Sequence, residues 1–400
     1  MPLFVMKKEG VYFPVMTKLG FVSLFGAIAS AMVSTIWAIY IDSFVHSAAI
    51  VGFISGALAL ISFFSYFVFI PVLEKHNKSR LFFFSIFLFG LLYLLFAINK
   101  NFYVFIVLAC VMNLIFVVRL TSFGIIVKDK SPKKKLSKNE GILYTFANLA
   151  WVIGPLIAGF LASRAGISSV FLLSAFFCFA SFLLFRFSKV NDAHIVKKSH
   201  GNAFKSFIGF FESKDRVLSY LVSAGISFWW SLIYIFIPVY MVEQGLTDML
   251  VAYFLFAIPI PLIFLEFKSG KLAGKIGFRK MFKFGFLFVA ICCAACFFLI
   301  DVNIYLILVI LVISSIGMAM LEPTSEAYFF DITKDKEEPR YYGPHKTSID
   351  AGQFVAKILS GVILSFLAFK FLFVFFAVVM LIMFFVSFRI KNVVEAKKKC

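Results

Sequence analysis

The sequence is poor in charged residues. Asp, Glu, Lys and Arg make up 15% of its 400 residues and hydrophobic residues 62%, whereas soluble domains carry about 25% charged and roughly 45–50% apolar residues. So little charge excludes an ordinary soluble protein. The apolar residues form long runs along the whole chain, each near the roughly 20 residues that a helix needs to cross a bilayer. We therefore predict a membrane protein throughout.

Motifs for enzymatic chemistry are missing as well. The sequence contains no G-x-S-x-G motif, no H-E-x-x-H motif and no G-x-x-x-x-G-K-[ST] phosphate-binding loop, which argues against a hydrolase, a zinc protease and an ATPase. The five histidines fall in or beside loops: His46, His76, His194, His200 and His345. A membrane enzyme needs a nucleophile with its base, or clustered metal ligands, at membrane depth. We expect neither enzymatic activity nor a cofactor.

Cysteine is scarce, and its placement is uninformative about chemistry. Five of the six cysteines lie in apolar runs, and Cys400 ends the chain. This placement indicates no disulfide framework. Cys293 and Cys296 have the spacing of a metal-ligand pair, but they lie within one apolar helix and lack a second pair or a nearby histidine. We expect no metal site.

Acidic residues are few beside the basic ones, which give the chain a net charge of +19. All but five of the 39 Lys and Arg residues fall in the termini and in every second loop. The exceptions are Lys100, Arg164 and Lys370 in the opposite loops, and Arg119 and Lys357 within apolar runs. By the positive-inside rule we expect both termini in the cytoplasm. We expect the protein itself in the cytoplasmic membrane of a bacterium or archaeon. The positive charge indicates topology and contact with anionic lipid, not a nucleic-acid partner.

The apolar runs predict twelve membrane helices. They cover 18–42, 48–70, 80–98, 102–127, 141–163, 168–187, 217–242, 248–267, 281–300, 304–330, 344–367 and 371–390. Outer loops such as 99–101 and 301–303 are short, so neighbouring helices form tight hairpins. We expect function to lie within the membrane, with Pro238, Pro259, Pro261 and Pro323 marking bent or broken helices.

The longest linker separates two sets of six helices. The predicted domains are an N-terminal six-helix bundle at 1–187, a cytoplasmic linker at 188–216 and a C-terminal six-helix bundle at 217–400. In the linker, four apolar residues recur at helical spacing opposite charged ones: Phe204, Phe207, Ile208 and Phe211 opposite Lys205, Glu212 and Lys214. This pattern predicts a short helix in the cytoplasmic membrane interface.

A loop motif occurs after the second helix of each half. The second half reads G-K-L-A-G-K-I-G-F-R-K from Gly270 to Lys280, and the first reads I-P-V-L-E-K-H-N-K-S-R from Ile70 to Arg80. Gly277 corresponds to Asn77, and both residue types readily adopt left-handed backbone angles in a tight turn. Basic residues follow in both halves.

This loop resembles the signature of the major facilitator superfamily, G-x-L-a-D-r-x-G-r-k-k. Matching residues are Gly270, Lys275, Gly277, Arg279 and Lys280, while Gly274 replaces the family's Asp. In the first half Glu74 takes the acidic position, with Asn77 at the turn and Lys78 and Arg80 as its basic partners. The resemblance implies an all-α fold of two pseudo-symmetric six-helix bundles, a usually monomeric protein and a cytoplasmic charge latch. Positive-inside residues without a latch are the alternative.

The fifth predicted helix resembles the proton-antiporter motif of the same family, G-x8-G-x3-G-P-x2-G-G. Gly141, Gly154, Pro155 and Gly159 match it, and Ala150 and Ala158 replace two glycines. The resemblance implies the drug/proton antiporter type. Small residues at these spacings also permit close helix packing, and proline bends the helix, so any rocking transporter would use them.

Five ionisable residues lie inside predicted helices: Arg119, Glu322, Glu326, Asp350 and Lys357. Because a charge facing lipid costs about 2.5–3.5 kcal/mol on insertion scales, each is expected to face a partner or a cavity. One hypothesis pairs Arg119 with Glu322 across the two halves when a cytoplasmic gate closes, and the alternative pairs Glu322 with Lys357 as static structure. For proton coupling we predict Glu322 or Glu326, with Asp350 second and Lys357 as modulator.

Polar and aromatic residues of the predicted helices suggest a substrate cavity. The candidates are Trp37, Tyr40, Asn113, Asn148, Trp230, Tyr234 and Gln353. A place in the aromatic belt at the membrane surface is the alternative for the aromatic ones.

The sequence therefore predicts a secondary transporter that works by alternating access. We predict proton-coupled export of small amphipathic compounds, with a small-molecule substrate, protons and the bilayer as partners. The alternatives are uptake of a sugar, organic anion or peptide, and a sensor or flippase on the same fold.

Overall fold

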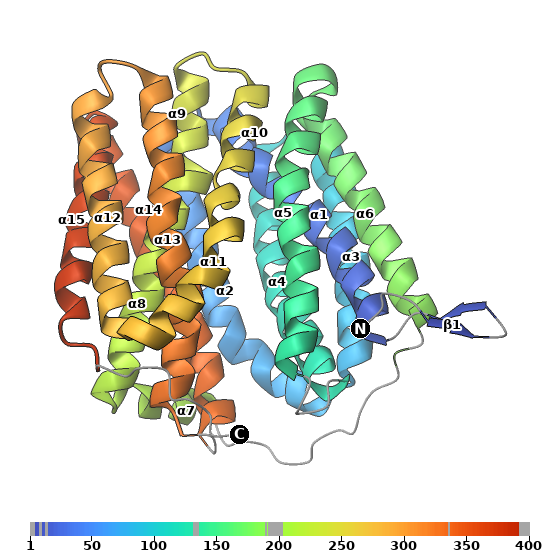
Figure 1. The fold of residues 1–400 in the computed structure, drawn as a ribbon. Helices are drawn as coiled ribbons and strands as arrows, with labels where there is room; N and C mark the ends of the chain where they lie inside the picture. Colours follow the sequence, from blue (N-terminus) through green and yellow to red (C-terminus); the bar gives the residue numbers. More distant parts are fainter. Residues whose placement is uncertain are drawn as a thin grey trace. The chain divides into compact units, whose positions relative to one another are not determined.

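The apolar runs fold as long helices in the computed structural model, which describes residues 5–7, 10–12, 15–130, 136–188, 190, 203–334 and 337–391 (Figure 1). A two-stranded antiparallel hairpin comes first, in which β1 (Val5–Lys7) pairs with β2 (Gly10–Tyr12). The first half continues with α1 (Val15–Val45), α2 (Ala48–Lys75), α3 (Lys78–Ile98), α4 (Phe102–Lys130), α5 (Leu136–Ala165) and α6 (Ile167–Ser188).

The second half begins with the linker helix α7 (Ala203–Phe211). The remaining elements are α8 (Lys214–Ser231), a π-helical turn η2 (Leu232–Phe236), α9 (Ile237–Glu243), α10 (Asp248–Ala257), α11 (Pro259–Ile276), α12 (Phe278–Leu299), α13 (Ile304–Ile332), α14 (Glu338–Phe366) and α15 (Lys370–Ser387). α8, η2 and α9 follow one another in a single span, as do α10 and α11.

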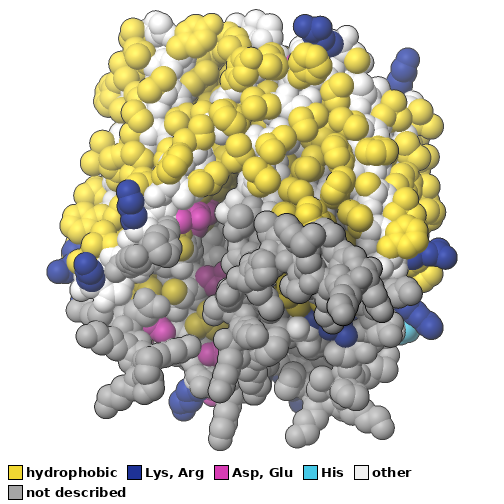
Figure 2. Space-filling model, turned by 45° about the vertical axis from the view of Figure 1, so that its right-hand side comes forward, with side chains coloured by type: hydrophobic (Ala, Val, Ile, Leu, Met, Phe, Trp, Pro, Cys, Tyr) yellow, Lys and Arg dark blue, Asp and Glu magenta, His cyan; other side chains and the backbone are white. Residues whose placement is uncertain are grey.

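Twelve helical segments among the described residues are long and apolar enough to cross a membrane. Their bounds differ from the predicted runs by a few residues, so the predicted spans are confirmed. Large apolar side chains remain exposed on these helices, such as Tyr103, Phe298 and Phe366 at 78%, 75% and 84%. On the face drawn in Figure 2, hydrophobic side chains cover most of the upper surface, and Lys and Arg lie mainly at its margins. Such a surface suits lipid and not water.

Two of the four predicted prolines lie at breaks in the second half, while Pro261 lies within α11. Pro238 lies at the start of α9, directly after the π-helical turn, and Pro259 begins α11. Because proline lacks a backbone N–H and its ring clashes with the preceding turn, a helix bends or restarts there. Pro155 and Pro323 instead lie inside α5 and α13.

The contacts divide the chain into two compact units. Unit 1 comprises 1–40, 64–199 and 247–253, and unit 2 comprises 41–63, 200–246 and 254–400. Part of α2 therefore packs with the second half, and the start of α10 with the first. The predicted domain boundaries follow chain order and stay a prediction.

Unit 1 is built around close contacts of α3 with α4 and α6 and of α5 with α1. A Cβ placed on Gly154 would lie 2.5 Å from the Cβ of Ala31, so the backbones of α5 and α1 approach closely. At the end of α1, the Tyr40 hydroxyl lies 3.3 Å from the carbonyl oxygens of Phe96 and Asn99. These contacts fix α1 against α3.

Unit 2 is built around α12 between α13 and α15, and around α8 against α14. Gly352 of α14 faces the backbone of α8, where an added Cβ would lie 2.5 Å from the carbonyl oxygen of Ala224. The α2 segment approaches α14 in the same way, because a Cβ on Gly52 would lie 3.0 Å from the carbonyl oxygen of Lys357. Both helix pairs therefore meet backbone to backbone.

These close approaches predict the effect of adding a single methyl group. Replacing Gly352 with Ala should destabilise the protein by about 1–3 kcal/mol, since the backbone of α8 must shift. Gly124 in α4 has nothing within 4 Å of the corresponding position, so Gly124→Ala should leave stability unchanged or raise it by up to about 1 kcal/mol. Thermal unfolding of the purified variants in detergent measures both. Equal unfolding temperatures of Gly352→Ala and Gly124→Ala would contradict the packing of α8 against α14.

Candidate functional site: charged groups in the membrane-spanning helices

Glu322 lies in α13 and accepts a hydrogen bond from the indole N–H of Trp230 in α8. The neighbouring Trp229 donates from Nε1 to the Ser314 hydroxyl at 3.0 Å, which fixes the end of α8 against α13. The Trp230 ring stacks on Tyr234 with centroids 5.4 Å apart. Tyr234 lies in η2, and π-helical turns are frequent at functional sites. A carboxyl group thus adjoins a pair of stacked aromatic rings.

Glu322 also has a second acid as neighbour. Glu266 of α11 lies near enough to interact electrostatically with Glu322, and α11 packs against α13. Within unit 2, no Lys or Arg of the described residues forms an ion pair with Glu322. Its described partner is therefore the neutral Trp230.

Glu326, one turn further along α13, has a different environment. It forms an ion pair with Lys346 at 2.9 Å and accepts a hydrogen bond from the Tyr342 hydroxyl at 2.6 Å. Next to it, the ring of His345 stacks on Phe329 at 4.3 Å. From the sequence, Glu322 and Glu326 were equal candidates for proton coupling. Their environments differ, because α14 supplies a cation to Glu326.

The charges of α14 interact with one another. Lys357 donates from Nζ to Oε1 of Gln353 at 2.8 Å, and it interacts electrostatically with Asp350 two turns away. Among the described residues there is no ion pair between Lys357 and Glu322. The structure thus brings Gln353, Asp350 and Lys357 together on one helix.

Arg119 of α4 lies in unit 1. Its Nη2 donates to the Ser30 hydroxyl at 3.0 Å, and its guanidinium lies over the Phe89 ring at 4.1 Å from the centroid. Within the described part of unit 1 it forms no ion pair with a carboxylate. Aromatic faces can hold a desolvated cation. Because Glu322 belongs to unit 2, the predicted pairing of Arg119 with Glu322 stays a prediction.

The remaining cavity candidates of the first half mostly pack locally. Trp37 and Tyr40 both contact the rings of Phe96 and Phe105. Asn113 donates to the carbonyl oxygen of Ala109 in its own helix at 2.8 Å, and Asn148 is exposed. The structure therefore places Trp37 and Tyr40 in an aromatic cluster, while Trp230 and Tyr234 adjoin Glu322.

A family model described as Major Facilitator Superfamily matches residues 19–300 and 258–399. This chain belongs to the Major Facilitator Superfamily. The predicted membership of this superfamily and the predicted twelve-helix fold are confirmed. No curated protein matches the sequence.

Solved structures of transporters share the fold at low sequence identity. A mutant of the peptide transporter POT in complex with alafosfalin is 14% identical, with 94% of each chain covered and a TM-score of 0.75. A POT family transporter in complex with a thioalcohol conjugated peptide is 12% identical over 94% of this chain and 95% of that one, with a TM-score of 0.77. A bacterial homologue of the iron transporter ferroportin, in an inward-facing state, is 14% identical over 94% and 98%, with a TM-score of 0.67.

The loop motif of this superfamily member includes two turns of different kinds. Gly277 has a φ of 84° between α11 and α12, the left-handed angle expected there. Asn77 has a φ of −66° instead, so the expectation of a left-handed angle is wrong for it. Its side chain caps α3 by accepting from the backbone N–H of Arg80 at 2.8 Å, as Asn commonly does at helix starts.

The structure describes the surroundings of most of the other residues in the loop motif. Arg279 donates from Nε to the carbonyl oxygen of Ile390 at 2.6 Å and so holds the chain shortly after α15 ends at Ser387. Lys275 and Lys280 are exposed, Lys78 is partly buried, and open space surrounds Gly270. The side chain of Glu74 lies outside the described residues, so the latch stays a prediction.

The α5 motif of this superfamily member lies at close helix contacts. Gly154 faces Ala31 of α1, and Gly159 faces Ala252 of α10. Pro155 lies inside the helix next to the first of these contacts. Gly141 lies in α5, but its surroundings are outside the described residues. The small residues permit close packing, which any member of the superfamily with moving helices can use.

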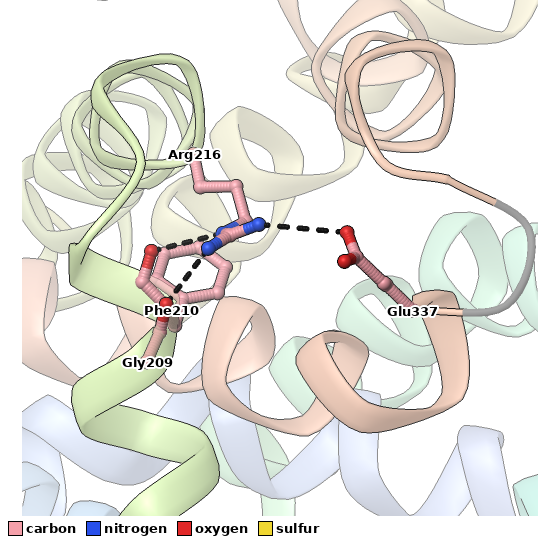
Figure 3. A network of polar contacts seen from close by, with 4 residues as sticks. All are labelled: Gly209, Phe210, Arg216 and Glu337. Carbon is pink, nitrogen blue, oxygen red and sulfur yellow. Dashed lines mark hydrogen bonds and ion pairs between the residues drawn. The ribbon is translucent and has the colours of Figure 1, made fainter.

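Sequence reasoning missed a network that holds the linker helix. Arg216 of α8 donates from Nη2 to the carbonyl oxygen of Gly209 at 2.7 Å and from Nε to that of Phe210 at 3.0 Å (Figure 3). Its third interaction is an ion pair with Glu337 at 3.7 Å. The free carbonyls at the C-terminus of a helix attract cations, and this general rule was the available signal in the sequence.

Two side chains of α7 should contribute very differently to the stability of the protein, because one is buried and the other is exposed. Phe210 is fully buried and contacts Phe329 and Tyr341, whereas Ile208 is 52% exposed. Phe210→Ala should destabilise the protein by about 3–5 kcal/mol, as truncation of a buried phenylalanine does. Ile208→Ala should have little effect in detergent. Thermal unfolding of the two variants tests this, and a Phe210→Ala variant as stable as Ile208→Ala would contradict the described packing.

Proposed function

We propose that this protein is a proton-coupled secondary transporter that exports small amphipathic compounds from the cell by alternating access. The observation that carries this proposal is the environment of Glu322, a carboxyl group inside a membrane-spanning helix with a neutral hydrogen-bond donor and a second acid beside it. An ionised carboxylate in an apolar region is costly without a cation. Such a group is suited to bind a proton and to release it when its surroundings change.

The proposal assigns different roles to the intramembrane charges. Glu322 carries the proton, and Glu266 lies near enough to interact with it electrostatically. Glu326 is held by Lys346 and Tyr342 and therefore serves the contact of α13 with α14. Asp350 and Lys357, which interact with each other on α14, modulate the proton coupling.

The substrate class follows from the groups around Glu322. The stacked rings of Trp230 and Tyr234 offer an apolar surface and aromatic faces, and the carboxyl groups offer negative charge. Aromatic faces and carboxylates together favour an amphipathic compound with an amine. Substrate and proton would then compete for the same carboxyl group, which couples export to proton entry.

The second candidate is proton-coupled uptake of an organic anion or a peptide. It is favoured by Arg119, whose guanidinium contacts Ser30 and Phe89 but forms no ion pair within the described part of its unit. A guanidinium group suits a carboxylate or phosphate group. Solved structures with this fold include the peptide transporter POT and a POT family transporter in complex with a thioalcohol conjugated peptide.

Proton flux in liposomes tests the proposal. The purified protein is reconstituted with an internal pH-sensitive dye, and cationic amphiphiles, organic anions and short peptides are added in turn. We expect cationic amphiphiles to drive proton movement, and Glu322→Gln to reduce it to the level of empty liposomes because the amide can neither bind nor release a proton at this pH. Glu326→Gln, matched in helix and chemistry, should keep substrate-driven proton flux.

Thermal unfolding separates loss of coupling from loss of folding. Glu322→Gln should unfold at the temperature of the unmodified protein, while its exchange of labelled substrate falls because the neutral amide no longer attracts the amine. Substrate-driven proton flux that persists in Glu322→Gln would contradict the role of this residue. Flux driven by anions or peptides and lost in Arg119→Gln would favour the second candidate.

A further inference from the structure

One side of the linker helix α7 packs against the rest of unit 2. Ser206 and Phe210 are 7% and 0% exposed, and Gly209 lies against Tyr341. The Phe210 ring contacts Tyr220 and Phe329, which belong to α8 and α13. Together with the hydrogen bonds from Arg216, these contacts fix the rotation of α7 about its own axis (Figure 3).

The other side of α7 carries exposed apolar residues. Phe204, Ile208 and Phe211 are 60%, 52% and 38% exposed. They are four and three positions apart, so they form one stripe along the helix. Phe207, beside this stripe, contacts Phe63 of α2. Because Phe210 fixes the helix, the stripe is held outward at Ile208, while the partly exposed Phe211 also contacts the ring of Tyr220, with centroids 5.1 Å apart.

Charges and chain position identify what the stripe meets. α7 ends at Phe211, three residues before α8 begins its membrane span at Lys214, so α7 lies where the chain enters the bilayer. Lys205 follows Phe204 on α7 and Lys214 begins α8, and both are exposed, as is the acid Glu212 between the two helices. An apolar stripe with lysines at its edge matches the boundary between acyl chains and anionic headgroups.

We propose that α7 is a lipid-binding surface. Ile208 and Phe211, with Phe204, enter the cytoplasmic leaflet, and Lys205 and Lys214 bind the phosphate groups of anionic phospholipids. This interaction goes beyond the proposed transport function, since it depends on neither the substrate nor the proton. Through Phe210 it connects the lipid surface to Phe329 in α13, the helix that also carries Glu322.

Photocrosslinking in nanodiscs tests this proposal on the full chain. A benzophenone amino acid replaces Ile208 or Phe211, and the nanodiscs contain phosphatidylethanolamine, phosphatidylcholine and phosphatidylglycerol in known proportions. After irradiation, mass spectrometry identifies the adducts. The same amino acid at Phe284, which is 58% exposed on α12, is the positive control. At Gln244, exposed in the loop after α9, it is the negative control.

We expect lipid adducts at positions 208 and 211, with phosphatidylglycerol enriched about fivefold over its share, the ratio that one lysine–headgroup contact gives. The double variant Lys205→Gln/Lys214→Gln should reduce this enrichment and keep the lipid adducts. Peptide adducts, or no lipid adducts at 208 and 211 while position 284 reacts, would overturn the proposal. Phosphatidylglycerol at its bulk share in the unmodified background would overturn the role of the lysines.

Discussion

The structure depends on one constraint, which is that a charge inside an apolar helix needs a polar partner. Lys346 and Tyr342 hold Glu326, and Gln353 accepts from Lys357. Arg119 has the Ser30 hydroxyl and the face of Phe89. Glu322 differs, because its described hydrogen bond comes from the neutral indole of Trp230 and its electrostatic neighbour is another acid. The proposed transport mechanism follows from this difference, since a weakly compensated carboxyl group is the one best able to exchange a proton.

The local structure around Glu322 supports this interpretation. Trp229 is fixed to Ser314, so the adjacent Trp230 is presented to α13 from a defined position. The π-helical turn that follows places Tyr234 against Trp230, and Pro238 restarts the helix one turn later. Irregular backbone at membrane depth is tolerated where it is buried in protein or lines a cavity. The break in this span therefore coincides with Trp230 and Tyr234, the aromatic residues that the proposal assigns to substrate.

Much of the fold was predictable because each span must be apolar over its whole length. That requirement gave the twelve helices, and proline chemistry located the breaks near Pro238 and Pro259. The partners of the charges were not predictable, because they depend on how each helix is rotated. Glu322 and Glu326 are one turn apart, yet only Glu326 meets a lysine from α14. The role of Asn77 was not predictable either, since asparagine suits both a left-handed turn and a helix cap. The structure shows that it caps α3.

The most direct test of the central claim is infrared difference spectroscopy of the protein in membranes, recorded as substrate binds. The account predicts that binding changes the absorption of a protonated carboxyl group, that Glu322→Gln abolishes this band, and that Glu326→Gln keeps it. A substrate-induced carboxyl band that remains in Glu322→Gln and is lost in Glu326→Gln would contradict the assignment of the proton to Glu322.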